Sequence, residues 1–88
     1  MKIRTSGPFD HDYAKLLLHI KKRADKQFAI LLQDPHYPGL RVKKMEGRPG
    51  NEKIFEARVT EGYRFTFQIL GDEYILRRIG PHDILRTP

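Results

Sequence analysis

The sequence predicts an α+β fold, with helices in the first half of the chain and an antiparallel β-sheet in the second half. Between residues 9 and 32 the apolar residues recur at helical spacing, whereas residues 53–83 contain three runs rich in β-branched and aromatic residues. With 88 residues the chain has room for one hydrophobic core. We therefore expect residues 1–88 to form a single domain in which helices pack on a sheet.

The three runs between residues 53 and 83 are separated by two turn signals, Thr60-Glu61-Gly62 and Gly71-Asp72, which is the pattern of a three-stranded meander. Side chains alternate between the two faces of a strand. One face is predicted to be apolar and to contain Phe55, Ala57, Val59, Tyr63, Phe65, Phe67, Ile69, Ile75 and Ile79. The opposite face is predicted to be polar and mainly basic, with Glu56, Arg58, Arg64, Thr66, Gln68, Arg78 and His82. This asymmetry is the main indication of function in the sequence.

The N-terminal half begins with a short alternating segment, residues 2–5, that is expected to form an edge strand. Ser6-Gly7-Pro8 marks a helix start and Asp34-Pro35 a helix end. The pattern between them fits either one long helix or two helices separated near Leu18-His19, because no Gly or Pro interrupts it. After a loop at residues 36–39, residues 40–45 fit a further strand or an extended basic segment, and residues 46–51 form a turn-rich connection.

The charge balance favours a polyanionic partner. The chain has 17 Lys and Arg against 11 Asp and Glu, a formal net charge of +6. It has no cysteine, which excludes disulfides and thiolate metal sites. No apolar run approaches the roughly 20 residues of a membrane span, and no secretory signal opens the chain. The expected location is the cytoplasm.

His82 is the first candidate for chemistry, since histidine is the residue type that exchanges protons most readily near neutral pH. It shares the polar face with Arg64, which lies in the middle of a strand where a guanidinium can grip a phosphate with two hydrogen bonds. The structural alternatives are a histidine that caps the strand end and a cross-strand pair between Arg64 and Glu56. Arg58 and Arg78 extend the basic face.

A basic stretch precedes the meander and contains Lys43, Lys44, Arg48 and Lys53. It fits either a solvated surface or a track for a phosphate backbone. Other chemistries lack their residues: the histidines have no zinc-ligand spacing, no phosphate-binding glycine loop is present, and Ser6 is the only serine. Catalysis without metal or cofactor is expected, by acid–base transfer with cationic stabilisation of an oxyanion or phosphorane.

The order of L-R-V-K-K-M-E-G, K-I-F-E-A-R-V, G-Y-R-F-T-F-Q-I and I-L-R-R-I-G-P-H-D-I-L after a helical half resembles the RelE/ParE superfamily of toxins from type II toxin–antitoxin modules. The resemblance covers nearly the whole chain and is densest between residues 40 and 85. It implies a helical hairpin packed on one face of a twisted antiparallel sheet. It also implies a neutralising antitoxin with an acidic or amphipathic C-terminal segment.

Ribonuclease members of that superfamily cleave mRNA, usually on the ribosome and without metal, by attack of a 2′-hydroxyl on the adjacent phosphate. The resemblance assigns Arg64 to phosphate contact and places His82 where some members have a catalytic histidine. It places Arg58 and Lys53 where relatives carry basic residues. The predicted catalytic residues are Arg64, His82, Arg58 and Glu56, and the predicted RNA-binding residues are Lys43, Lys44, Arg48, Lys53 and Arg78.

Two departures from the superfamily leave the general base open. Phe55 and Ala57 occupy the region where some members have a lysine pair, and residues 86–88 provide no catalytic tyrosine. The base is His82 itself, or Glu46, Glu52 or Glu56 with His82 as the acid. The alternative functions are a ParE-like toxin that blocks DNA gyrase by binding to it, and a degenerate relative that only binds an antitoxin.

Overall fold

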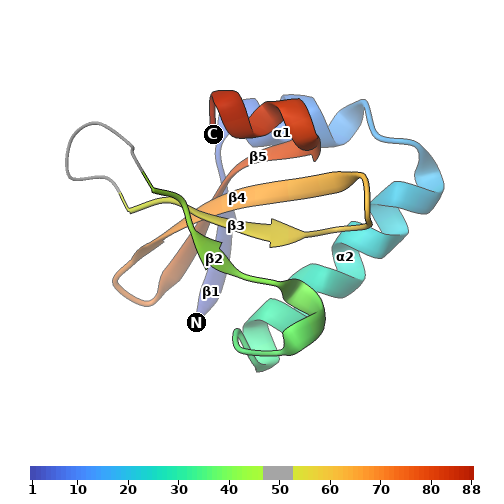
Figure 1. Ribbon diagram of the computed structural model, residues 1–88. Coiled ribbons are helices and arrows are strands. Elements are labelled where there is room, and N and C mark those ends of the chain that lie inside the picture. The colour runs from blue at the N-terminus through green and yellow to red at the C-terminus, as the bar shows by residue number, and fades with distance from the viewer. Residues whose placement is uncertain (47–52) are drawn as a thin grey trace.

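Five strands and two helices make up the computed structural model, which describes residues 1–46 and 53–88 (Figure 1). In chain order they are β1 (Lys2–Thr5), α1 (Gly7–Ala14), α2 (Leu18–Gln33), β2 (Lys43–Lys44), β3 (Phe55–Arg58), β4 (Tyr63–Leu70) and β5 (Glu73–Pro81). Two short 3-10 helices, η1 (Pro38–Leu40) and η2 (His82–Arg86), follow α2 and β5. The α+β class, the N-terminal strand and the three-stranded meander are confirmed.

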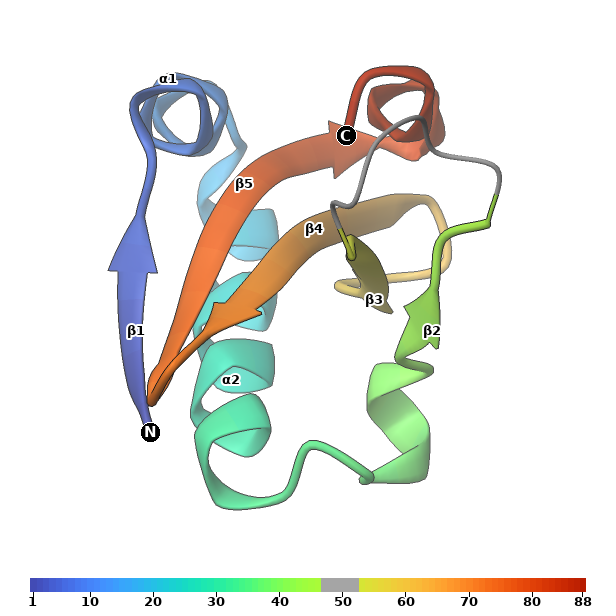
Figure 2. The same ribbon diagram turned by 90° about the vertical axis from the view of Figure 1, so that its left-hand side faces the viewer.

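The sheet has the strand order β1-β5-β4-β3-β2, and Figure 2 shows the strands in this order with α2 passing behind β5 and β4. The pairs within the meander and between β2 and β3 are antiparallel, but β1 runs parallel to β5. The sheet is therefore mixed rather than purely antiparallel. A parallel neighbour is possible here because helices, and not a hairpin turn, follow β1 along the chain.

The break between the two helices falls at residues 15–17, which decides between one long helix and two. Leu17 has an extended backbone (ψ 150°), and α2 begins at the next residue. Ser6 starts α1, since its Oγ accepts a hydrogen bond from the Phe9 amide at 3.3 Å. At the other end, α2 stops at Gln33, directly before the Asp34-Pro35 signal. Both predicted helix boundaries are confirmed.

A series of aromatic rings connects the helices to the sheet. Phe9 of α1 meets Phe28 of α2 edge-on at 5.8 Å between ring centroids, and Phe28 meets Phe65 of β4 at 5.1 Å. Along the sheet the series continues through Phe67 to Tyr74, with centroids 5.9 and 5.6 Å apart. These contacts fix both helices on the same, apolar face of the sheet.

A β-bulge in β5 changes which residues of that strand face the core. Thr66 pairs with Arg78, but the next residue, Phe67, pairs with Leu76, so Arg77 is left as an extra residue. Strict alternation along β5 is interrupted at this point. Leu76 therefore lies on the same face as Phe67 and is buried in the core.

The bulge makes one prediction wrong. Strict alternation predicts Ile75 on the apolar face, but Ile75 pairs with Gln68 on the polar face, and its neighbour Tyr74 enters the core instead. Ile79, which lies beyond the bulge, is on the apolar face as predicted and pairs with Phe65. The sequence does not predict the bulge, because two consecutive arginines, Arg77 and Arg78, contain no glycine or other residue typical of a bulge.

Beyond the end of β1, a side chain of α1 takes the place of a strand partner along the edge of β5. Asp12 of α1 accepts hydrogen bonds from the Ile79 amide at 3.2 Å and from Arg78 Nε at 2.6 Å. Burial raises the pKa of Asp12, but the hydrogen bonds from Arg78 and from the Ile79 amide outweigh it, so that this pKa is below its ordinary value. Asp12 thus connects α1 to the sheet across 66 residues of sequence.

Replacing Asp12 by asparagine is expected to lower the free energy of unfolding at pH 7 by about 1.5–3 kcal/mol, the range for a hydrogen bond to a charged group. The pKa of Asp12 is depressed in the folded state, so its contribution is complete above the pKa of the unfolded chain and disappears as pH falls through the folded value. The free energies of unfolding of the wild type and the Asp12→Asn variant can be compared by urea unfolding at pH 7 and at about pH 2.5. The difference between them should be smaller at the acid pH.

The matched control for this substitution is Asp72→Asn, in the exposed turn between β4 and β5, which should change stability by about 0.5 kcal/mol or less. An equal loss for Asp12→Asn at both pH values would show that the carboxylate charge is not what stabilises the contact.

No helix within residues 1–46 or 53–88 combines the length and apolar character that crossing a bilayer requires.

Candidate functional site

The polar face of the sheet is partly covered by η2. Gly80 lies opposite Arg64, and a Cβ atom at Gly80 would be 2.9 Å from Cγ2 of Ile84 in η2. Glycine at this position allows η2 to approach the strand closely. Thr66, on the same face, is fully buried, and its Oγ1 has no hydrogen-bond partner among the described residues. The accessible part of the polar face therefore lies beside η2.

Two rows of side chains cross this face. In the first, Arg58 of β3 is opposite Arg64 of β4, which is opposite Gly80 of β5. The Cα atoms of directly opposed residues lie about 4.5–5.5 Å apart, so the two arginines are close neighbours. The second row runs from Lys43 of β2 through Glu56 and Thr66 to Arg78 of β5.

Arg64 is half-buried and fixed at its base by the turn between β3 and β4. Its Nη1 donates hydrogen bonds to the carbonyl oxygens of Thr60, Glu61 and Tyr63 at 2.6, 3.0 and 3.0 Å. All three bonds leave from one nitrogen of the guanidinium. The alternative of an ion pair with Glu56 is not formed within residues 1–46 and 53–88, where Glu56 is opposite Thr66 instead. The Arg64 guanidinium is thus fixed in position and forms no ion pair with a carboxylate among the described residues.

His82 is the first residue of η2 and is exposed. The preceding residue, Pro81, still belongs to β5 and pairs with Tyr63 at the start of β4. His82 therefore comes two residues after Gly80, the strand partner of Arg64. The register brings the backbone of His82 to the end of the sheet that also carries Arg64 and Arg58.

Arg78 is engaged in internal contacts. Its guanidinium reaches around the edge of β5 to Asp12 and also donates to the backbone and side-chain oxygens of Thr87, both at 3.2 Å. The hydrogen bond with Asp12 raises the pKa of Arg78 further above its ordinary value. Its role in RNA binding remains a prediction, and its observed contacts connect α1, β5 and the C-terminal segment.

The predicted RNA-binding lysines point in different directions. Lys43 is opposite Glu56 and belongs to the polar face, whereas Lys44 is opposite Phe55 and belongs to the other face. Lys53 is exposed just before β3, and Glu46 is exposed after β2. Arg48 and Glu52 lie outside the described residues.

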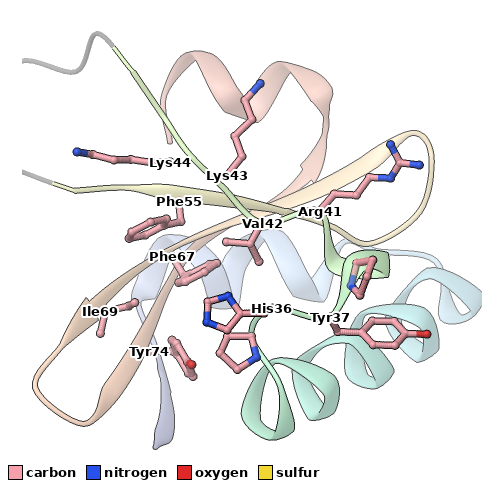
Figure 3. A pocket seen from close by; sticks show the side chains of 12 residues that line it. His36, Tyr37, Arg41, Val42, Lys43, Lys44, Phe55, Phe67, Ile69 and Tyr74 are labelled. Carbon is pink, nitrogen blue, oxygen red and sulfur yellow. The ribbon is translucent and has the colours of Figure 1, made fainter.

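A groove of about 510 Å³ lies on the apolar face, beyond the end of α2 (Figure 3). Its floor consists of aromatic and aliphatic side chains from three strands, Phe55, Phe67, Ile69 and Tyr74. Lys43 and Lys44 stand at its rim and extend away from that floor (Figure 3). The groove opens on the face opposite Arg64, so it is separate from the polar rows.

A second hollow, of about 460 Å³, lies between α2, η1 and the end of β3. Four cationic residues line it: Arg23, Lys26, Arg41 and Arg58. The sequence showed basic residues throughout α2 but did not distinguish these from the rest. Only the fold brings Arg23 and Lys26 beside Arg41 and Arg58. In the sequence, the excess of basic residues was the one indication of this site, and it does not identify these four residues.

Within residues 1–46 and 53–88, no group of three or more His, Cys, Asp or Glu side chains is arranged to hold a metal ion. The chemical groups that the polar face offers are therefore guanidinium and ammonium groups, the Glu56 carboxylate and the His82 imidazole. Such a set can bind a phosphate and transfer protons to and from oxygen.

No family model matches the sequence, and no curated protein matches it significantly. Solved structures, however, match its fold along nearly the whole chain. A copper-bound mutant toxin from Helicobacter pylori is 23% identical, with a TM-score of 0.78 over 97% of this chain and 98% of that one. YafQ from E. coli is 15% identical, with a TM-score of 0.76 over 94% of each chain.

A chain of the archaeal RelE–RelB complex from Pyrococcus horikoshii is 18% identical, with a TM-score of 0.73 over 91% of this chain and 92% of that one. These likenesses establish the fold. The chain has a RelE-like fold, and the fold that the resemblance implies is confirmed.

Proposed function

We propose that this chain is the toxin of a type II toxin–antitoxin module and that it cleaves mRNA on the ribosome without a metal ion. The observation that carries the proposal is the first polar row. Arg58 and Arg64 are direct neighbours on adjacent strands, and His82 follows two residues after the third member of the row. Two cationic residues and an imidazole group thus come from one end of the polar face, which supports the proposal.

The proposed reaction is attack of the RNA 2′-hydroxyl on the adjacent phosphate. The 2′-oxygen forms a bond to phosphorus and loses its proton to a base, while the bond to the 5′-oxygen breaks and that oxygen gains a proton from an acid. The products are a 2′,3′-cyclic phosphate and a 5′-hydroxyl. Arg64 stabilises the crowded phosphorane through the guanidinium nitrogens that do not hold the turn, and Arg58 supports it from the neighbouring strand.

His82 is proposed as one of the two proton-transfer groups. Glu56 is the described carboxylate in the neighbouring row, between Lys43 and Thr66, and is the candidate for the other group. Glu46 is exposed beyond β2 and is less well placed on the sheet. In this arrangement Glu56 acts as base and His82 as acid.

Primer extension on mRNA from cells that briefly express this chain tests the proposal. Cuts at codon-phased positions are expected, together with growth arrest. Growth arrest with intact mRNA and loss of gyrase supercoiling would instead support a ParE-like toxin. Harmless expression of the folded chain would identify it as a relative that only binds an antitoxin.

The proposed partner is a small cytoplasmic antitoxin with an acidic or amphipathic C-terminal segment. Two solved complexes with the same fold, the archaeal RelE–RelB complex and the E. coli DinJ–YafQ complex, support such a partner. The net charge of +6 favours acidic segments electrostatically. Co-purification with the product of an adjacent gene is the expected result.

A further inference from the structure

The cationic hollow between α2, η1 and the end of β3 has features of a binding site for single-stranded RNA. Arg23 and Lys26 are three residues apart on α2 and therefore project from the same side of that helix. Arg41 faces them from the residue after η1, and Arg58 closes the hollow at the end of β3. None of the side chains that line this hollow is acidic.

These cations are held in place relative to one another. Gln27 of α2 donates a hydrogen bond from Nε2 to the carbonyl oxygen of Arg58 at 2.8 Å, which joins the helix to the strand. Arg41 has a left-handed backbone conformation (φ 48°), although it is not a glycine. Residues with such a strained backbone are concentrated at functional sites.

An exposed aromatic ring accompanies the cations. Tyr37 lines the same hollow and is 49% exposed. A Cβ atom on Gly39 would lie 2.7 Å from Cε2 of this ring, so the ring rests directly on the glycine backbone. Figure 3 shows the Tyr37 ring and the Arg41 side chain pointing away from the aromatic floor of the neighbouring groove. A fixed, exposed ring beside several cations suits a nucleotide base and its phosphates.

We infer that this hollow is a second RNA subsite, in which Arg23, Lys26 and Arg41 bind backbone phosphates and Tyr37 stacks on one base. The identification of RNA as the ligand rests on the proposed function. Arg58 belongs both to the hollow and to the row with Arg64. In this proposal, a strand whose scissile phosphate lies at Arg64 runs past Arg58 into the subsite. The exposed ring and the cations together suit a nucleotide, which offers a flat base to the ring and a phosphate to the cations.

The test is binding of a fluorescent 2′-O-methyl RNA oligonucleotide, which keeps the phosphates but has no 2′-hydroxyl to attack. The variant of the hollow, called the cleft variant, carries both Arg23→Gln and Lys26→Gln. For single strands, the logarithm of the binding constant falls with the logarithm of salt concentration by about 0.7 for each phosphate contact, so two lost contacts reduce the slope by about 1.4. The same relation predicts roughly 25-fold weaker binding at about 0.1 M salt.

The matched control is Lys2→Gln with Lys22→Gln, which removes the same charge from exposed positions outside the hollow. It should leave the slope nearly unchanged. Tyr37→Ala should weaken binding by at least about fivefold without changing the salt slope, because stacking releases no counterions. Tyr37→Phe keeps the ring and should bind like the wild type.

Three results would overturn the inference: cleft and control variants that bind RNA alike, a wild-type protein that does not bind the oligonucleotide, or a cleft variant that loses affinity only for an acidic peptide. The last would assign the hollow to a protein segment. Salt-dependent binding to the oligonucleotide without cleavage of unmodified mRNA on ribosomes would refute the proposed function and leave the subsite intact. Circular dichroism of each variant verifies folding.

Discussion

Replacing His82 by glutamine is expected to slow single-turnover cleavage of mRNA on programmed ribosomes by about 100- to 10,000-fold, the usual contribution of a general acid or base. Glutamine retains much of the bulk and can form hydrogen bonds, but it cannot exchange a proton near neutral pH. Because His82 is exposed at the start of η2, the substitution should change the free energy of unfolding by about 0.5 kcal/mol or less. One limb of the pH–rate profile should disappear with the histidine.

His19→Gln is the control, since His19 is also exposed and lies on α2. It should cleave at the wild-type rate. A His82→Gln variant that keeps both the wild-type rate and the wild-type pH profile would remove His82 from proton transfer. The candidate groups would then be Glu56 and the exposed Glu46.

Much of the fold follows from local patterns. The Gly71-Asp72 signal predicts the β4–β5 hairpin, and Gly71 indeed has the left-handed conformation (φ 60°) that favours glycine. Ser6-Gly7-Pro8 and Asp34-Pro35 predict the ends of the helical region because capping and proline restrictions act within a few residues. Such features depend on neighbours in the sequence.

The features that the sequence did not predict depend on distant residues. The bulge at Arg77 turns Ile75 away from the core, and it is defined only by the register against β4. The contact between Arg78 and Asp12 spans 66 residues. This contact is possible because β1 ends before it reaches Ile79 and so does not pair with that part of β5. No local sequence pattern predicts where that pairing stops.

In the candidate site, too, the features set by sequence neighbours were predictable and those set by distant residues were not. Alternation along β3 and β4 predicted correctly that Arg58 and Arg64 share a face. It did not predict that η2 packs on that face, because this packing depends on the close approach of Ile84 to Gly80 after β5 has ended. Lys43 and Lys44 were grouped as one basic stretch, yet strand geometry sends them to opposite faces.

Arg64→Ala is expected to reduce the single-turnover rate by about 100- to 1,000-fold, the effect of removing one preorganised group that stabilises developing charge. The loss should persist at saturating ribosome concentration, because the guanidinium is proposed to act on the phosphorane more than on the bound substrate. Arg64 also holds the carbonyl oxygens of Thr60 and Glu61. These can be rehydrated, so we expect a stability cost of about 1 kcal/mol.

Arg64→Lys separates the two roles. The ammonium group can still donate to the turn carbonyls, so stability should return to near the wild-type value, but it lacks the planar fork that grips a phosphate with two bonds. We therefore expect a rate between those of the wild type and the alanine variant. Arg4→Ala, which removes an arginine whose side chain is 61% exposed on the far edge strand, is the control and should not alter the rate. If folded Arg64→Ala cleaves as fast as Arg4→Ala, Arg64 serves only to hold the turn, and the phosphorane must be stabilised by other cations of the polar face.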